Sequence, residues 1–392
     1  MSDVFIVSAV RTAIGAFGGS LKNHAPTELG ALVTREAIAR SGLNAEQVGH
    51  VVFGQVIPTE PKDAYLARVA AVNGGVPHAT PAMTVNRLCG SGLQAIVSAA
   101  QAIRLGDCQV AIGGGAEVMS RAPFLSTGMR WGRKMGDEVL IDALNGALTD
   151  PFGDILMGVT AENVAERYGI SREDQDQLAA TSQARAAHAI AEGRFTSQIL
   201  PVQIKVRGKP AEFAVDEHGR ETTVEDLAKL RPIFRAENGT VTAGNASGIN
   251  DGAAAVVLAD EATVKAQGLK PMARLVAYAH QGVDPAYMGI GPVPATRTVL
   301  ERAGLSVADL DVIEANEAFA AQACAVSREL GFDPAKVNPN GSGISLGHPV
   351  GATGAIITTK LLHELERVGG RYGLATMCIG GGQGIAAIFE RV

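Results

Sequence analysis

The decisive stretch of this sequence is Val85-Asn86-Arg87-Leu88-Cys89-Gly90-Ser91-Gly92-Leu93. An apolar segment ends here, small residues follow, and a helical pattern runs from Leu93 to Ala100. A cysteine at a helix N-terminus faces unpaired backbone N–H groups and the positive end of the helix dipole, and both favour the reactive thiolate. Cys89 is therefore a candidate nucleophile. The alternative is a small cysteine buried in the core.

A similar order of segments occurs twice along the chain. Three pairs correspond: residues 40–43 with 302–305, 85–92 with 337–343, and 109–115 with 374–382. In each copy, short apolar strands alternate with amphipathic helices, such as those expected over 27–40 and 296–303, which is the pattern of βαβ units. We therefore expect two similar α/β halves that face each other, with equivalent strand-to-helix turns converging at one point.

The repeat is lost between about Met119 and Ala243. This stretch contains Trp131 and a helix expected over 172–192, with Ser171 as N-cap and Asp174 completing a capping box. Residues 244–252 then return to the scaffold, followed by a strand over 253–259. Insertions on a rigid scaffold commonly carry substrate recognition. The expected domains are an N-terminal half (1–118 plus 244–270), an inserted loop domain (119–243) and a C-terminal half (271–392).

Composition limits the class of protein. A chain of 392 residues is expected to form two or three domains, and its 47 glycines have no collagen-like period. The net charge of −6 and the lack of an apolar run of about 18–20 residues predict no binding to nucleic acid or membrane. Residues 1–7 predict a first strand rather than a signal peptide. Four cysteines without CxxC spacing indicate reduced thiols and a cytoplasmic location.

The C-terminal half contains possible partners for Cys89. His348 precedes a helix expected over 355–365, and its imidazole could act as a base toward a thiol; the alternative is a histidine satisfied within a turn. Cys378 ends a strand next to three glycines, where backbone can approach a ligand closely. Asn316 follows a strand expected over 310–313, and its amide could orient a water or polarise a carbonyl. The duplication places the Cys89 and His348 turns in equivalent positions.

Five motifs in this order resemble those of the thiolase family: Leu88-Cys89-Gly90-Ser91-Gly92, Gly113-Gly114-Gly115-Ala116-Glu117-Val118-Met119-Ser120, Asn316-Glu317-Ala318-Phe319, Gly347-His348-Pro349 and Cys378-Ile379-Gly380-Gly381-Gly382. The resemblance runs from Val10 to Ile385 and is greatest to bacterial acetyl-CoA acetyltransferases and short-chain β-ketothiolases. It implies a five-layered αβαβα fold of duplicated halves with an inserted loop domain. The implied activity is ping-pong acyl transfer: reversible condensation of two acetyl-CoA molecules, and thiolysis of short-chain 3-ketoacyl-CoA.

The resemblance also implies a role for each candidate. Cys89 would carry the acetyl group, and His348 would accept its proton. Cys378 would exchange the α-proton of the second substrate. Asn316 would hold a water that forms one oxyanion hole with His348, and the backbone N–H groups of Cys89 and Gly380 would form the other. Preorganised donors are needed because a thioester α-proton is weakly acidic.

Coenzyme A and its thioesters are the implied small-molecule partners. The residues implied to contact them are Ser247, Arg220, Met157, Leu156, Ala243, Ala318, Phe319 and Met288. The segment from Arg194 to Lys209 contains four basic residues and no acidic residue. These residues could bind the phosphates of CoA, or they could simply form a solvated surface. We expect no cofactor and no metal, because no histidine has metal-ligand spacing. The expected assembly is a homotetramer, a dimer of dimers, with contacts near residues 120–133.

Other readings fit the sequence less well. A β-ketoacyl synthase would present a second histidine at position 316 and lack Cys378. A nicotinamide-dependent dehydrogenase would need a GxGxxG after the first strand, and a silent CoA-binding relative would have lost one of the three reactive groups. Cys108 and Cys324 are expected to be packing cysteines.

The first prediction concerns the acyl pocket. Members directed at acetoacetyl-CoA usually have His-Met-Gly where this chain has Leu156-Met157-Gly158. An isobutyl group makes this wall apolar, so we expect tolerance for longer 3-ketoacyl groups, or else weaker binding of the thioester arm. The kcat/KM values for acetoacetyl-CoA and 3-ketovaleryl-CoA are expected to differ by less than about tenfold. A larger preference for acetoacetyl-CoA would contradict the broader tolerance.

Overall fold

The computed structural model describes residues 3–392, so Met1 and Ser2 of the expected first strand lie outside the described residues. The main sheet has 11 strands, nine of which lie in the order β15-β16-β17-β14-β1-β13-β5-β3-β4. Short β2 and β10 pair with β13 and β1. The bounds are β1 Val4–Thr12, β2 Gly15–Ala16, β3 His50–Gly54, β4 Ala82–Val85, β5 Val110–Val118, β10 Ile199–Leu200, β13 Asn250–Asp260, β14 Ala273–Gly282, β15 Val312–Ala315, β16 Tyr372–Ile379 and β17 Gln383–Arg391.

The strand order repeats within this sheet. In the first half, β4, β3 and β5 are parallel neighbours, and β13 and β1 follow antiparallel. In the second half, Val337 forms a parallel bridge to Ile313 of β15, β16 is parallel to β15, and β17 and β14 follow antiparallel. The duplication predicted from the sequence is therefore present in the topology. The halves join where β1 pairs with β14 through Phe5 and Ile6.

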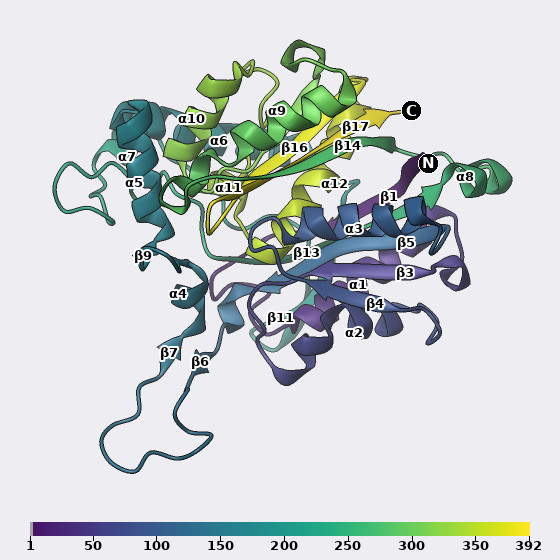
Figure 1. Ribbon diagram of the computed structural model, residues 1–392, viewed down its shortest axis with the longest axis horizontal. Coiled ribbons are helices and arrows are strands. Elements are labelled where there is room, and N and C mark those ends of the chain that lie inside the picture. The colour runs from purple at the N-terminus through teal and green to yellow at the C-terminus, as the bar shows by residue number, and fades with distance from the viewer. Residues whose placement is uncertain (1–2) are drawn as a thin grey trace.

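The helices form three layers around the two halves of the sheet (Figure 1). Helices α1 (Pro26–Ser41) and α2 (Leu66–Asn73) cover the outer face of the first half, and α9 (Pro292–Ala303), with α10 (Ala320–Leu330) beside it, covers that of the second. Between the halves lie α3 (Ser91–Leu105) and α12 (Val350–Val368). Because α12 packs on β5 and β13 and also on β15 and β16, the predicted αβαβα layering is confirmed.

Strand β5 continues through its three glycines, which the sequence pattern placed at its end. A Cβ atom on Gly113 would lie 2.6 Å from Ile96 Cα of α3, and one on Gly115 would collide with the carbonyl oxygen of Gly351 in α12. Because glycine has no side chain, the backbones of α3 and α12 can both contact the backbone of β5 at these positions.

The segment between β5 and β13 contains short strands and several helices. They are the 3-10 turn η3 (Met119–Arg121), β6 (Phe124–Leu125), β7 (Ile141–Asp142), α4 (Ala143–Ala147), β8 (Thr149–Asp150), β9 (Ile155–Leu156), α5 (Met157–Tyr168), α6 (Arg172–Ala191), β11 (Val202–Val206), β12 (Lys209–Phe213) and α7 (Val224–Ala228), besides β10. The capping box of Ser171 and Asp174 is confirmed. The loop between β6 and β7 projects far from the rest of the chain (Figure 1). A fully buried ion pair between Arg11 and Asp216, 2.7 Å long, ties the segment to β1.

The remaining helices are short: α8 (Glu261–Gln267) and α11 (Gly343–Leu346). Across residues 3–392, no helix has the length and apolarity that a bilayer crossing requires.

Glu117 on β5 connects the two halves near the start of α12. The oxygens of its buried carboxyl group accept the backbone N–H groups of Val56 (2.9 Å), Ile57 (3.2 Å) and Gly351 (2.9 Å). Burial raises the pKa of Glu117 to about 8, although the three N–H donors act in the opposite direction.

The second prediction concerns this carboxylate. In Glu117→Gln the new NH2 group faces a backbone N–H, so one buried donor loses its acceptor. We expect a loss of about 1–3 kcal/mol in the free energy of unfolding, measured by urea denaturation. The matched control is Glu237→Gln at an exposed position, expected to change stability by less than about 0.5 kcal/mol. Equal effects of the two substitutions would contradict the role of Glu117.

Candidate active site

Cys89 lies in the turn between β4 and α3, which the structure places against the other half of the molecule. Leu88 adopts a left-handed conformation (φ 46°), which non-glycine residues rarely adopt. A Cβ atom on Gly90 would lie 2.6 Å from Ile379 Cδ1, and one on Gly380 would lie 3.5 Å from Leu88 Cδ1. The turn that carries Cys89 therefore contacts the end of β16, as the duplication predicts.

Burial decides the protonation state of Cys89. The backbone N–H groups of Gly380 and Cys89 itself hydrogen-bond to the sulfur and lower its pKa, but desolvation raises it more, and nearby Glu117 adds to this. The pKa of Cys89 is raised to about 11. The stabilisation of the thiolate by backbone N–H groups, expected from the sequence, is present, but it is smaller than the cost of burying the charge. At pH 7 Cys89 is a thiol that needs a base.

His348 is a buried imidazole with partners on both ring nitrogens. Its backbone N–H donates to Asn250 Oδ1 (2.9 Å), its Nδ1 lies 2.7 Å from Thr353 Oγ1, and its Nε2 lies 3.4 Å from Asn316 Nδ2. Burial lowers the pKa of His348 to about 4, so the ring is neutral at pH 7. A neutral imidazole can accept a proton.

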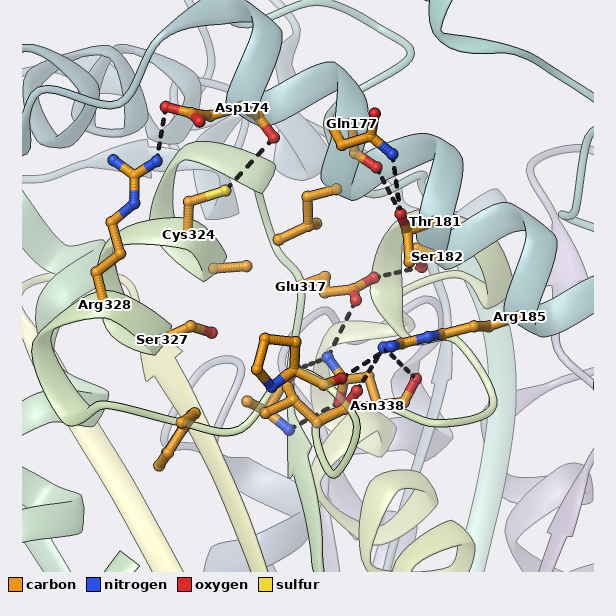
Figure 2. Close-up of a pocket in the computed structure, with 16 residues that line it drawn as sticks. Asp174, Gln177, Thr181, Ser182, Arg185, Glu317, Cys324, Ser327, Arg328 and Asn338 are labelled. Carbon is orange, nitrogen blue, oxygen red and sulfur yellow. Dashed lines mark hydrogen bonds and ion pairs between the residues drawn. The ribbon is translucent and has the colours of Figure 1, made fainter.

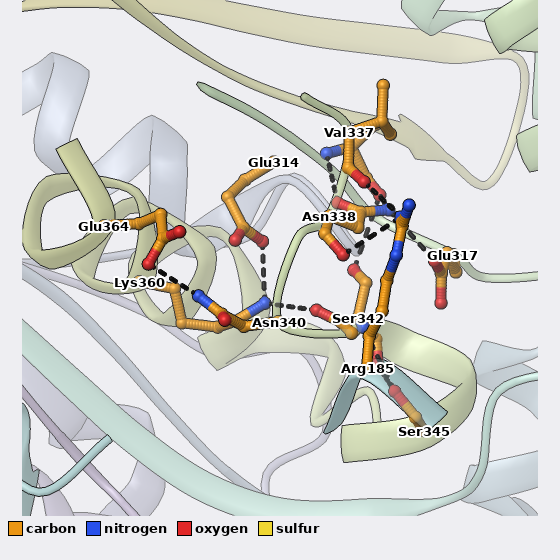
Figure 3. A network of polar contacts seen from close by, with 12 residues as sticks. Arg185, Glu314, Glu317, Val337, Asn338, Asn340, Ser342, Ser345, Lys360 and Glu364 are labelled. Atoms are coloured by element: carbon orange, nitrogen blue, oxygen red, sulfur yellow. Dashed lines mark hydrogen bonds and ion pairs between the residues drawn. The ribbon is translucent and has the colours of Figure 1, made fainter. Parts of the chain in front are cut away.

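Asn316 follows β15, and a network of buried polar groups around Asn338 and Glu317 holds the residues on either side of it (Figure 3). The Asn338 side chain accepts from the N–H of Ala315 (2.9 Å) and donates to its carbonyl (2.8 Å) and to Glu317 Oε1 (3.0 Å). Ser182 Oγ donates to the other Glu317 oxygen at 2.6 Å. Asn316 Oδ1 has no protein partner among the described residues. The supporting roles of Glu317, Asn338 and Ser182 were not predicted from the sequence.

Cys378 lies fully buried at the end of β16. It packs in one apolar cluster with Met157, Met288 and Ala318, and Phe319 packs against that cluster. Burial and the neighbouring Cys89 raise the pKa of Cys378. Four of the expected substrate-contacting residues thus surround the second thiol.

A cavity of about 390 Å³ lies beside these groups. The expected residues that line it are Leu156, Met157, Arg220, Ala243, Ser247, Phe319 and His348. Met119 and Val350 also line it, and Cys89 packs against the cluster that contains both. The structure therefore brings the expected site residues to one region. Lining residues that the sequence analysis missed include Leu148, Ile233 and Phe234; their apolar side chains in an irregular segment carry no distinctive sequence signal.

The other basic candidates lie elsewhere. Arg194 pairs with Glu192 at 2.7 Å and donates to Asn340 Oδ1 at 2.9 Å. Lys205, Arg207 and Lys209 lie on or between β11 and β12 and are exposed. Arg220 lines the 390 Å³ cavity, whereas these four basic residues do not.

A second cavity, of about 290 Å³, lies between α6 and α10 and reaches Glu317 (Figure 2). Cys324 lines it, and burial raises the pKa of its thiol to about 12, which agrees with a packing role. None of the expected site residues lines this second cavity. Across the part of the chain that the structure describes, no cluster of three or more His, Cys, Asp or Glu side chains could hold a metal ion.

Comparisons with known proteins identify this arrangement of two α/β halves and two thiols. Family models for the thiolase N-terminal domain and the thiolase C-terminal domain match residues 4–262 and 269–391. The chain belongs to the thiolase family. It is 68% identical to β-ketothiolase BktB of Cupriavidus necator over 100% of this chain and 99% of that protein.

Two solved structures have the same fold. The acetyl-CoA acetyltransferase of Bacillus anthracis is 48% identical, with a TM-score of 0.97 over 100% of this chain and 99% of that one. Human mitochondrial 3-ketoacyl-CoA thiolase in complex with CoA is 46% identical, with a TM-score of 0.96 over 100% of this chain and 98% of that one.

The third prediction follows from the raised pKa of Cys89. Because only the thiolate reacts, the rate of Cys89 modification by iodoacetamide should rise about tenfold per pH unit from pH 7 to 9, followed by peptide mass spectrometry. Cys108, whose thiol pKa is also raised to about 11, serves as an internal comparison and should show a parallel slope. A plateau for Cys89 below about pH 8 would mean that the thiolate is already present at neutral pH.

Proposed function

We propose that this protein is an acetyl-CoA C-acetyltransferase that also cleaves short-chain 3-ketoacyl-CoA. The observation that carries the proposal is the meeting of Cys89, His348, Asn316 and Cys378 beside one cavity. Two thiols and a neutral imidazole suit reversible transfer of an acetyl group between sulfur and carbon. The similarity to a named β-ketothiolase and a named acetyl-CoA acetyltransferase supports the same reaction.

In the first half-reaction, Cys89 Sγ attacks the carbonyl carbon of acetyl-CoA. The Cys89 proton passes to His348 Nε2, the bond from the acetyl carbon to the CoA sulfur breaks, and the departing CoA thiolate takes the proton of Cys378. These steps leave acetyl-Cys89, an imidazolium on His348 and a thiolate on Cys378. Cys378, a buried thiol with a raised pKa, becomes a base in this way because the CoA leaving group takes its proton.

In the second half-reaction, the Cys378 thiolate removes an α-proton from a second acetyl-CoA. The resulting carbanion attacks the acetyl carbon on Cys89, a carbon–carbon bond forms, and the Cys89 thiolate departs and recovers its proton from His348. The N–H groups of Cys89 and Gly380, which already hydrogen-bond to the sulfur, would stabilise the oxyanion on the acetyl group. Asn316, through a water, and protonated His348 would stabilise the enolate oxygen.

The CoA moiety would occupy the 390 Å³ cavity. Arg220 would face its nucleotide end and Ser247 its pantetheine arm, with Met157, Met288, Ala318 and Phe319 around the acyl group and Leu156 and Ala243 on the walls. The CoA complex of the human 3-ketoacyl-CoA thiolase supports this class of ligand. No metal or other cofactor takes part in these steps.

The proposal extends to organisation and assembly. Residues 119–243 would form a loop domain that binds CoA and makes contacts between subunits. Its projecting arm exposes large apolar side chains, with Trp131 92% and Met135 88% exposed. Exposed apolar surface of this kind indicates a protein interface, so we propose a homotetramer. The bacterial relatives support a cytoplasmic location.

The fourth prediction separates the roles of the two thiols. After brief exposure to acetyl-CoA, intact-protein mass spectrometry should detect an acetyl adduct that free CoA removes, and Cys89→Ala should form none. Cys378→Ala should still form the adduct, yet condense acetyl-CoA at least about 100-fold more slowly, because it lacks the base. Cys108→Ala, at a half-buried position outside the site, is the matched control and should behave as the parent protein. Turnover retained in Cys89→Ala would overturn the proposal.

A further inference from the structure

The protonation pattern of His348 depends on a residue that the proposed mechanism does not use. Thr353 lies in the first turn of α12, five residues after His348, and its hydroxyl is 2.7 Å from His348 Nδ1. Both groups are buried, with 5% of His348 and 2% of Thr353 exposed. Their hydrogen bond is therefore protected from competition with solvent.

A count of protons fixes the direction of this bond. The Thr353 hydroxyl also lies 2.9 Å from the carbonyl oxygen of Pro349, to which it donates. A hydroxyl has one proton, so toward His348 it can only accept, and the donor must be Nδ1–H. The ring is neutral at pH 7 because burial lowers the pKa of His348 to about 4, and a neutral imidazole carries a single N–H. Nε2 then carries no proton, and its lone pair faces the amide N–H of Asn316 at 3.4 Å.

The opposite tautomer would create two unfavourable contacts. If Thr353 donated to Nδ1, its oxygen lone pairs would face those of the Pro349 carbonyl at 2.9 Å. The proton would then lie on Nε2, where it would meet the amide N–H of Asn316 at 3.4 Å. Both neighbours of the ring therefore favour the proton on Nδ1.

We propose that Thr353 is a positioning residue whose hydroxyl holds the His348 proton on Nδ1 and so keeps Nε2 free to accept the Cys89 proton. The inference rests on the proposed function of His348 as the base of the first half-reaction. Without the Thr353 hydroxyl, neither the orientation of the His348 ring nor its tautomer would be fixed. The transfer of the acetyl group to Cys89 would therefore be slower.

The same helix offers a matched control. Thr358 Oγ1 donates to the Gly354 carbonyl at 2.8 Å, the same bond to the residue four positions earlier that Thr353 makes, and it is also buried. Thr358→Val therefore removes an equivalent helix contact without changing the group that contacts His348. Thr353→Ser keeps the hydroxyl and removes only the methyl group.

The kinetic test measures the single-turnover rate of acetyl transfer from acetyl-CoA to Cys89 by rapid quench and mass spectrometry. Thr353→Val should lower the rate constant by about 10- to 100-fold, as is typical when the partner of a functional histidine is lost, while KM for acetyl-CoA changes less than about threefold. Thr353→Ser and Thr358→Val should stay within about threefold of the parent protein. Equal rates in Thr353→Val and the parent would overturn the inference and leave the proposed function intact. A parent protein that forms no acetyl-Cys89 would instead overturn the proposed function.

A spectroscopic test does not depend on activity or on the folding of any Thr353 variant. Solid-state NMR of parent protein labelled with ¹⁵N-histidine, compared with His348→Gln to identify the His348 signals, distinguishes a protonated from an unprotonated Nδ1. We expect a protonated Nδ1 and an unprotonated Nε2 at pH 7. A proton on Nε2 in the parent protein would overturn the inference whatever the kinetics show.

Discussion

One buried glutamate side chain joins the two halves of the molecule beside the candidate active site. Glu117 accepts N–H groups from the segment after β3 and from Gly351 at the start of α12, within hydrogen-bonding distance in all three cases. An acidic group at a helix N-terminus is also favoured by the helix dipole. When ionised, Glu117 also raises the pKa of Cys89, as the smallest of the causes that act on that thiol. Burial is the larger cause of the raised pKa of Cys89, so the proposed nucleophile requires a nearby base.

The three reactive groups carry no charge at rest. Burial raises the pKa values of Cys89 and Cys378 and lowers that of His348, so two thiols and a neutral imidazole share one low-dielectric region. In the proposed mechanism, charge appears only when the thioester carbonyl is attacked, and backbone donors already face the sulfur at that point. Such preorganised donors need no reorientation as the oxyanion develops. The arrangement therefore stabilises the charged transition state more than the uncharged resting state.

Much of this could be predicted from the sequence because duplication and glycine motifs are local patterns. The capping box at Ser171 and the convergence of the turns followed from such patterns. Helix α12 starts at Val350, earlier than expected, because Gly351 and Gly354 are used for close packing rather than for a turn. The size of the desolvation that raises the pKa of Cys89 could not be predicted, since burial is not visible in one sequence. The supports of Asn316 lie far apart in the chain and have no common motif, so only the fold brings them together.

The geometry of the site finally depends on how closely the two central helices cross. A Cβ atom on Gly92 of α3 would lie 2.6 Å from the backbone nitrogen of Ala355, and one on Gly354 of α12 would collide with the backbone nitrogen of Leu93. The contacts are reciprocal, as a pseudo-twofold relation between duplicated halves requires. Each helix begins beside the turn that carries a reactive group, so a wider crossing would separate Cys89 from His348. Two glycines, one from each copy of the repeat, therefore allow the close helix crossing on which the proposed proton transfer from Cys89 to His348 depends.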